Sequence, residues 1–224
     1  MGRRTSSAAF LAFVLVLFLA LPGCHRSQDG LSVVGSTSVE PFAEALAEEF
    51  MHQHPGEKIF VQGGGSSAGI QAVRTGAAEV GMSSRNLIPE ERDLIPVPII
   101  YDAIAVIVHR ENPVDSLTLD QIRGIFSGEL TRWGGAGGKD RAITLVTREE
   151  GSGTREAFQS LIMGKKEISL GALVQDSNGA IRQVVGDDRN AIGYISLGLV
   201  NDRVRAVKID GVDPSVENIK NRRY

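Results

Sequence analysis

The chain has 224 residues, a formal net charge of −3 and 42% hydrophobic residues. This balance argues against nucleic-acid binding, because the sequence has no basic stripe and only 5% of its residues are aromatic. Cys24 is the single cysteine, so disulfides within the chain are excluded. The 26 glycines suit an α/β protein with many tight strand-to-helix turns, and the length fits one domain or two small lobes.

The N-terminus is typical of an export signal. Arg3 and Arg4 precede an apolar run over residues 8–21 that is short for a membrane span. The following Leu21-Pro22-Gly23-Cys24 resembles a lipoprotein signal, in which Cys24 becomes lipid-modified, although Pro22 is not the usual residue at its position. The alternative is an ordinary signal peptide cleaved nearby. Both predict export, with residues 1–23 removed, 24–30 as a tether and a mature charge of −5.

Strands and helices alternate from residue 31 onward. Apolar runs predict strands over residues 31–35, 58–62, 79–83, 142–146 and 191–196. Apolar residues at helical spacing predict helices over about 40–50, 118–126, 156–162 and 179–186, and a further helix follows Gly69 and runs through Val73. A β-branched-rich run over 97–108 is interrupted only by Asp102. This alternation predicts parallel or mixed sheets covered by helices.

Three hydroxyl-rich turns share the order strand, then Gly/Ser/Thr, then helix. They are Gly35-Ser36-Thr37-Ser38, Gly64-Gly65-Ser66-Ser67 and Gly151-Ser152-Gly153-Thr154. A serine or threonine in such a turn is most often a helix cap, and residues 36–38 are placed to cap the helix near Glu40. Three such turns at the carboxyl ends of strands also predict a ligand site, because helix N-termini offer unpaired N–H groups to an anion.

The third turn carries the strongest signal. Arg148 stands four residues before Ser152, and its planar, permanently charged fork suits an oxyanion bound through two hydrogen bonds. Because the mature chain is acidic, the anion has to be bound by local geometry rather than by the overall field. The sequence therefore predicts an oxyanion-binding protein.

These residues resemble the substrate-binding proteins of phosphate ABC transporters. The resemblance covers nearly all of the chain from Val33 and is carried by residues 35–41, 64–69, 119–128 with Trp133, 148–154 and 191–194. It implies a type II periplasmic-binding-protein fold, α/β and two-lobed, with a mixed helix-flanked sheet in each lobe. Lobe 1 is expected over residues 31–107 and 197–224, and lobe 2 over 108–196.

The resemblance also implies a phosphate site between the lobes. The implied ligand residues are Thr37, Ser38, Ser67, Ser84, Arg148, Ser152, Gly153 and Thr154, with Ser36, Ser66, Arg85, Asp102 and Glu150 in support. Glu150 falls where the family often has an acid that orients the arginine; an exposed carboxylate at a helix N-terminus is the equally plausible alternative. Arg85 either reaches the ligand or ties the lobes together.

One position departs from the family pattern. Some relatives have an aspartate where this chain has Ser84, and that carboxylate accepts the proton of hydrogen phosphate and so excludes sulfate. A serine hydroxyl accepts through a lone pair but does not repel a dianion. Asp102 is another possible acceptor, or a turn or hinge residue. Selectivity among phosphate, sulfate and arsenate stays open at this point.

The predicted function is capture of inorganic phosphate and its delivery to the permease subunits of an ABC importer, by a monomer tethered to the membrane through Cys24. The alternative is an oxyanion-sensing adaptor lipoprotein of the same fold. A hydrolase is disfavoured, because no histidine follows the glycine-serine turn as a base. We expect no metal and no cofactor, since the four histidines lack partners at metal-ligand spacing.

The C-terminus differs from the family pattern. Members usually continue past the equivalent of residues 216–220 with a strand and a closing helix on the first lobe, whereas this sequence stops at Tyr224. A compact variant, a truncated reading frame and a lobe completed by something else are the alternatives. A missing piece would leave apolar surface exposed.

Overall fold

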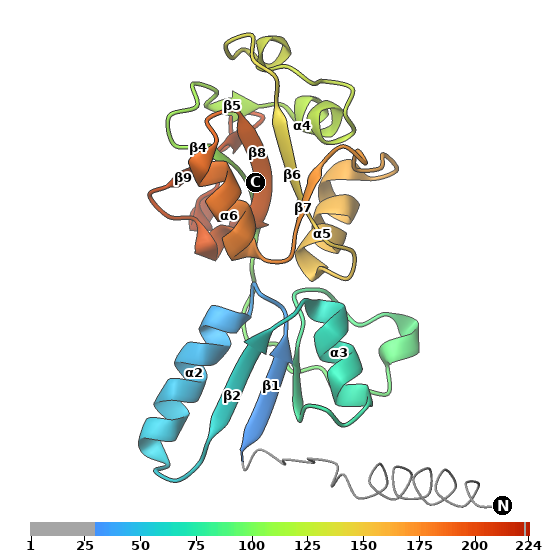
Figure 1. The fold of residues 1–224 in the computed structure, drawn as a ribbon, viewed down its shortest axis with the longest axis vertical. Helices are drawn as coiled ribbons and strands as arrows, with labels where there is room; N and C mark the ends of the chain where they lie inside the picture. The colour runs from blue at the N-terminus through green and yellow to red at the C-terminus, as the bar shows by residue number, and fades with distance from the viewer. Residues whose placement is uncertain (1–29, 222) are drawn as a thin grey trace, which may run out of the picture.

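The protein folds into two lobes, one above the other in Figure 1. This computed structural model describes residues 30–221, 223 and 224. The predicted signal peptide, Cys24 and the tether up to residue 29 lie outside the described residues.

The first lobe is built on a parallel three-stranded sheet in the order β2-β1-β3. Its strands are β1 (Leu31–Gly35), β2 (Ile59–Gly63) and β3 (Val80–Met82), with helices α2 (Glu40–Gln53) and α3 (Ser66–Arg74) and the short 3₁₀ helix η1 (Pro89–Glu91). Glu40 at the start of α2 accepts a 2.6 Å hydrogen bond from the N–H of Gly63 at the end of β2. This bond fixes the beginning of α2 against the carboxyl end of the sheet.

The second lobe is built on a five-stranded sheet in the order β7-β6-β8-β4-β9. The strands are β4 (Ile104–His109), β6 (Thr144–Arg148), β7 (Leu173–Gln175), β8 (Ala191–Ser196) and β9 (Val204–Ala206). The helices are α4 (Leu119–Phe126), α5 (Gly153–Phe158), α6 (Asn178–Asp187) and α7 (Val216–Lys220). The smaller elements are β5 (Ser116–Leu117), which pairs with β10 (Lys208–Ile209), and the short helices η2 (Trp133–Ala136), η3 (Gln159–Met163) and η4 (Leu197–Leu199).

The predicted α/β, two-lobed architecture with helix-flanked sheets is confirmed, with one correction to the sheets. The second sheet is mixed, because β4 runs antiparallel to both β8 and β9 while β6 runs parallel to β7 and β8. The first sheet is not mixed, since β1 is parallel to both of its neighbours.

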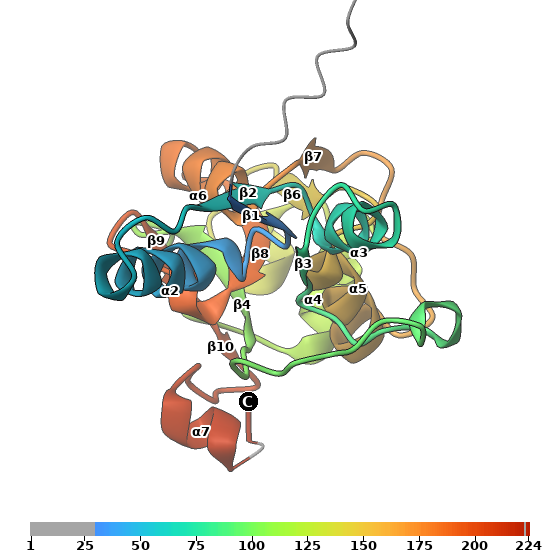
Figure 2. The same cartoon turned by 90° about the horizontal axis from the view of Figure 1, so that it is seen from below.

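The predicted lobe boundaries are wrong at both ends of the second lobe. All of β4 belongs to the second sheet, so the chain crosses between lobes before residue 104 rather than at 107. Residues 197–224 were expected on the first lobe, but β9 pairs with β4 and β10 pairs with β5. β9 and β10 stay on the second lobe because the edges of β4 and β5 offer backbone hydrogen-bond partners to them. In Figure 2, α7 extends from the second lobe beyond β10.

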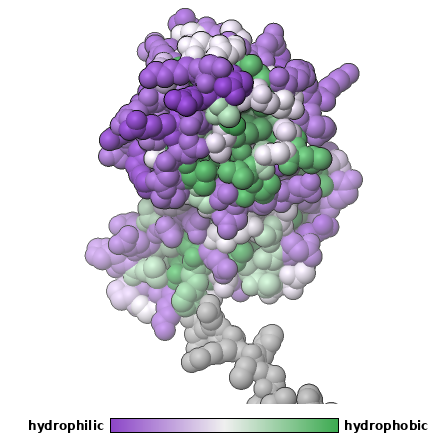
Figure 3. Space-filling model, turned by 45° about the horizontal axis from the view of Figure 1, so that its top comes forward, coloured by the Kyte–Doolittle hydropathy of each residue, from purple (hydrophilic) through white to green (hydrophobic). Residues whose placement is uncertain are grey.

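The crossing segment, residues 95–103, carries exposed apolar side chains. The strand expected from the apolar run at 97–108 forms only from Ile104, since Pro96 and Pro98 have no N–H to donate to a ladder. The exposed large apolar residues of this segment and of the first lobe are Leu31, Leu46, Phe50, Phe60, Val80, Ile88, Ile95, Val97, Ile99, Ile100 and Tyr101. The second lobe also exposes apolar side chains, and Figure 3 shows an apolar area on its visible face.

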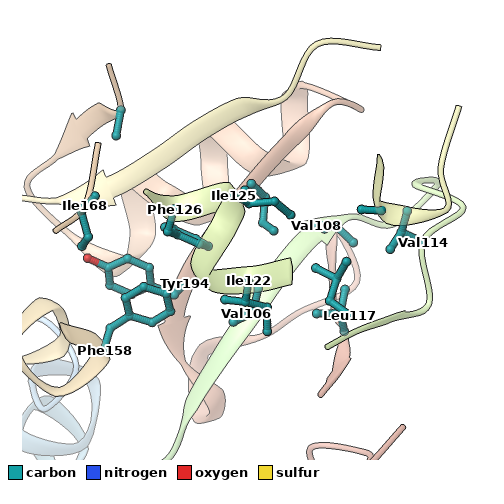
Figure 4. Packing of buried hydrophobic residues seen from close by; sticks show 14 of the residues in the cluster. Val106, Val108, Val114, Leu117, Ile122, Ile125, Phe126, Phe158, Ile168 and Tyr194 are labelled. Carbon is teal, nitrogen blue, oxygen red and sulfur yellow. The ribbon is translucent and has the colours of Figure 1, made fainter. Parts of the chain in front are cut away.

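The main hydrophobic core lies in the second lobe (Figure 4). Phe158 of α5 stacks on Tyr194 of β8 with ring centroids 4.0 Å apart and planes 4° from parallel, and Phe126 of α4 packs at a tilt against both rings. Offset and tilted aromatic packing adds to the free energy gained from burial. This cluster locks α5 to the sheet. Among the described helices, none is both long and apolar enough to cross a membrane.

Candidate functional site

The N-terminal ends of four helices face the junction between the lobes. In Figure 1, α2 and α3 point their first turns upward from the first lobe, while α5 and α6 point theirs downward from the second. The three predicted turns lie at the starts of α2, α3 and α5. The start of α6 is a fourth turn of the same kind, which the sequence reading did not include. Its signal was available, because Ser177-Asn178-Gly179 also stands between a strand and a helix.

The first turn meets the second lobe through its hydroxyls. Ser38 Oγ lies 2.7 Å from Thr154 Oγ1, and the side-chain amide of Asn178 donates to Ser38 Oγ at 3.0 Å and to Thr37 Oγ1 at 3.1 Å. Ser38, Thr154 and Asn178 are all buried. The structure therefore brings together predicted site residues that stand more than 100 positions apart in the sequence.

Helix capping explains only one of the three turns. Ser152 Oγ accepts a hydrogen bond from the backbone N–H of Arg155 and so caps α5. The expectation that residues 36–38 cap α2 is wrong, since the N-cap is Val39 and no side chain caps the helix. The N-cap of α3 is Gly65, again without a side-chain cap. The hydroxyls of Thr37 and Ser38 are thus available for contacts across the junction.

Close approach of the second and third turns depends on glycine. Ser67 N–H donates to the carbonyl of Gly151 at 3.1 Å, and Gly151 has φ of +89°, a conformation that side chains rarely adopt. A Cβ on Gly153 would lie 2.5 Å from Ser66 Oγ and 2.6 Å from Ser84 Oγ. Closure of this part of the junction thus requires that residue 153 has no side chain.

Ser66 and Ser84 form a hydroxyl pair on the first-lobe side. Ser84 N–H donates to Ser66 Oγ at 3.1 Å, and the two hydroxyl oxygens are 3.3 Å apart. Ser66 is fully buried and Ser84 is half-buried. Ser36 is buried beneath the first turn, where its Oγ accepts from Ser38 N–H. Ser67 is an exposed residue.

Arg148 is the buried cation of the junction, with 1% of the residue exposed. Its Nε and Nη2 each donate at 2.8 Å to the two oxygens of Glu149, and Nη2 also donates to the carbonyl of Asp176. The acid that orients the arginine is therefore Glu149 and not Glu150, and of the two interpretations of Glu150 the structure supports the exposed carboxylate. Glu150 is exposed. Glu149 directly follows the last residue of β6, whereas Glu150 already belongs to the turn that leads to α5.

Tyr194 supports Arg148 from the core. Its hydroxyl lies 2.8 Å from Thr147 Oγ1 and accepts a hydrogen bond from Arg148 N–H at 3.3 Å. Burial raises the pKa of this phenol, so it stays protonated at neutral pH. Arg155 adds a bond of 2.7 Å to the carbonyl of Arg148. Both the N–H and the carbonyl of Arg148, the last residue of β6, are therefore hydrogen-bonded to side chains.

Arg85 ties the lobes together. It forms a two-pronged pair with Glu91 of its own lobe, at 2.7 and 2.8 Å, and its Nε lies 3.0 Å from Glu156 of α5. The hydrogen bonds from Arg85 lower the pKa of Glu91 to about 2. Glu91 and Arg85 are shielded from solvent, whereas Glu156 is exposed. Arg85–Glu156 is the one ion pair between the lobes in the part of the chain that the structure describes.

Asp102 lies in the crossing segment and is exposed; it accepts a hydrogen bond from the N–H of Ala103. This bond fits the turn or hinge interpretation. No cluster of three metal-ligating side chains occurs within residues 30–224 as described. The junction instead offers hydroxyls, amides and the buried Arg148, a set that binds an oxyanion by donating hydrogen bonds.

The comparisons with known proteins agree with this geometry. Residues 23–224 match the family model described as a PBP superfamily domain. The phosphate-binding protein PstS of Bacillus subtilis is 33% identical over 209 residues, which cover 90% of this chain and 69% of the relative. This chain belongs to the family of phosphate ABC transporter substrate-binding proteins.

Two solved members of this family share the fold. One, from Clostridium perfringens, was assigned as a phosphate ABC transporter substrate-binding protein and solved with bound phosphate; it is 45% identical, with a TM-score of 0.83 and coverage of 87% of this chain and 82% of that one. The other is an ABC-type phosphate transport receptor from Vibrio cholerae, 37% identical, with a TM-score of 0.65 and the same coverage. The family consists of exported binding proteins that work with transporters, not of enzymes.

Gly153→Ala should block closure without harming the fold. The backbone at Gly153 is helical, so alanine fits it, while its Cβ would clash with both serines of the opposite lobe. Overpacking of about 1–3 kcal/mol corresponds to a loss of phosphate affinity of about fivefold to 150-fold. Calorimetric titration measures this, and small-angle scattering should show a more open particle. Gly179→Ala is the matched control, since its Cβ would meet nothing nearer than 3.9 Å; equal affinity losses in both variants would contradict the steric explanation.

The Arg85–Glu91 pair predicts a pH dependence of stability. The pKa of Glu91 is lowered from 4.5 to about 2. The pair thus stabilises the folded state at pH values above the unfolded pKa, and this contribution is lost as the pH falls from 4.5 towards 2. Denaturant unfolding across this range should show that the free energy of unfolding falls less steeply with decreasing pH in Glu91→Gln than in the unmodified protein. Asp93→Asn, which removes an exposed ion pair with Arg74, should leave the slope unchanged; a slope unaffected by Glu91→Gln would refute the assignment.

Proposed function

We propose that this protein captures inorganic phosphate between its two lobes and delivers it to the permease of an ABC importer. The observation that carries the proposal is the meeting of the Thr37, Ser38 and Thr154 hydroxyls at the junction, where the turn that supplies Thr154 follows the buried Arg148 guanidinium. We expect the ligand residues to be those predicted from the sequence, in particular Ser67, Ser84, Ser152 and Gly153, while Asn178 supports the hydroxyls of Thr37 and Ser38. Relatives named as phosphate-binding proteins, and a related structure with bound phosphate, support this choice of anion.

The physical basis of binding is a set of preoriented donors. Helix N-termini present unpaired N–H groups with partial positive charge, which favours a dianion without an equal number of cations. Arg148 is already desolvated and held in place by Glu149. Because the arginine does not have to be ordered when the anion arrives, less of the interaction energy is lost on binding.

The same proposal includes the location of the protein. Cys24 is the expected site of a lipid anchor, and the protein would act as a monomer tethered at the membrane surface. Labelling of growing cells with a radioactive or clickable fatty acid tests the anchor, with Cys24→Ser as the control. Incorporation that persists in Cys24→Ser, or none in the unmodified protein, would overturn it.

Arg148→Ala should reduce phosphate affinity at least about thirtyfold, because truncating a buried, hydrogen-bonded charge typically costs about 2–5 kcal/mol in a complex. Arg148→Lys should restore only part of this, since an ammonium has no planar fork. Arg132→Ala removes a solvent-exposed pair with Asp140 and serves as the control. Calorimetric titration of the unmodified protein with phosphate tests the function itself; absence of binding at tens of micromolar would refute it, and near-native affinity of Arg148→Ala would remove the arginine from the site.

Ser84 should make the site tolerant of sulfate. A neutral hydroxyl can donate to an unprotonated oxygen or accept from a protonated one, so both anions can be satisfied. We expect sulfate to compete with phosphate, and Ser84→Asp to weaken sulfate at least about tenfold more than phosphate, because a carboxylate repels the anion that has no proton to donate. Competition titrations measure the ratio, with Ser83→Asp as a neighbouring control. A sulfate-to-phosphate ratio that Ser84→Asp leaves unchanged would show that residue 84 does not read the anion.

A further inference from the structure

We propose that Asn178 is a specificity-determining residue of the anion site, because it restricts the hydroxyl of Thr37 to donating a hydrogen bond. This inference rests on the proposed function. It starts from the position of Asn178, 1% exposed at the first residue of α6, where it bridges the second lobe to the first turn of the other lobe.

The orientation of the Asn178 amide is fixed by its neighbours. Its Oδ1 accepts a 3.1 Å hydrogen bond from the backbone N–H of Ser196, a group that can only donate. The amide NH₂ must therefore face Thr37 and Ser38, and its two hydrogens are used by these two oxygens. A flipped amide would place two donors against each other at Ser196.

The fixed amide determines the role of the Thr37 hydroxyl. Thr37 Oγ1 receives both the side-chain amide of Asn178, at 3.1 Å, and its backbone N–H, at 3.4 Å. A hydroxyl oxygen has two lone pairs and one proton. With both lone pairs occupied, Thr37 can only donate its proton.

The protons and lone pairs of the Ser38–Thr154 pair can be counted in the same way. Ser38 Oγ accepts from Asn178 and lies 2.7 Å from Thr154 Oγ1, so one of the two hydroxyls donates to the other. Whichever does so, one hydroxyl proton of the pair remains for a ligand. Asn178 therefore makes the Thr37 hydroxyl a donor only, which suits an unprotonated oxyanion oxygen, and it also occupies one lone pair of Ser38. A carboxylate in its place would accept both protons and repel the anion.

Two substitutions of Asn178 separate this role from simple packing. Asn178→Ala removes the amide and should weaken phosphate binding about tenfold to a hundredfold, as expected for lost hydrogen bonds within a buried network. Asn178→Asp keeps the size but reverses the hydrogen bonding, so at neutral pH it should weaken phosphate further than Asn178→Ala. Relative to the unmodified protein at the same pH, Asn178→Asp should recover affinity as the pH is lowered to about 5, because the new carboxyl begins to protonate.

The control is Asn112→Asp, at a residue buried to a similar degree, whose amide bonds Arg189 and Val114 within the second lobe. It should lower the unfolding temperature without changing phosphate affinity. Calorimetric titration with inorganic phosphate at several pH values, with thermal unfolding of each ligand-free variant, distinguishes the outcomes. Suppose that the unmodified protein binds phosphate. If Asn178→Ala then binds it equally well, or Asn178→Asp binds it as well as Asn178→Ala at neutral pH, the role of Asn178 is refuted while the proposed function stands. If the unmodified protein does not bind phosphate, the proposed function fails and this inference with it.

Discussion

A buried guanidinium has to be paired, and the pairing of Arg148 governs the arrangement of the junction. The fork of Glu149 takes two of its nitrogens, and Asp176 offers a carbonyl from the turn that leads into α6. The backbone N–H of Arg148 donates to the hydroxyl of Tyr194, and the ring of Tyr194 stacks on Phe158. The charge at the site is thus connected to the aromatic core of the second lobe. Desolvating such a charge is costly unless every one of these partners is in place, so the site depends on the core that supports it.

The two lobes meet mainly through neutral groups. Hydroxyls, one amide and backbone N–H groups form the contacts, and Arg85–Glu156 is the one ion pair that joins the lobes within the described residues. Neutral contacts lose little to salt screening, whereas an ion pair with an exposed partner is screened. Opening and closing should therefore be governed by hydrogen-bond geometry more than by ionic strength. This suits an acidic protein that binds an anion, because its overall field opposes the ligand.

The sequence predicted what local pattern can encode. The strands of the first lobe, the helix after each of the three turns and the alternation of the two all follow from periodicity and turn chemistry, and Arg148 follows from its position before a glycine-rich turn. The contacts that the sequence did not reveal join distant residues: Asn178 lies 140 positions from Ser38. Glu149 and Glu150 are adjacent acids, and only the direction in which the chain leaves β6 decides which one faces the arginine. The placement of residues 197–224 depended on which strand edges stay open, which a single sequence does not show.

Glycine and serine together determine how closely the two lobes approach each other at this junction. The missing side chain of Gly153 lets Ser66 and Ser84 approach α5, so the opposing lobe meets the ligand cavity with hydroxyls rather than with a charge. On the other side, Asn178 restricts Thr37 to donation. Thr37 is thus fixed as a donor. The Ser66–Ser84 pair on the other face is not fixed in this way, because either of its hydroxyls can donate to the other. If the anion is bound as proposed, the neutral Ser66–Ser84 pair can accept from a protonated oxygen or donate to an unprotonated one.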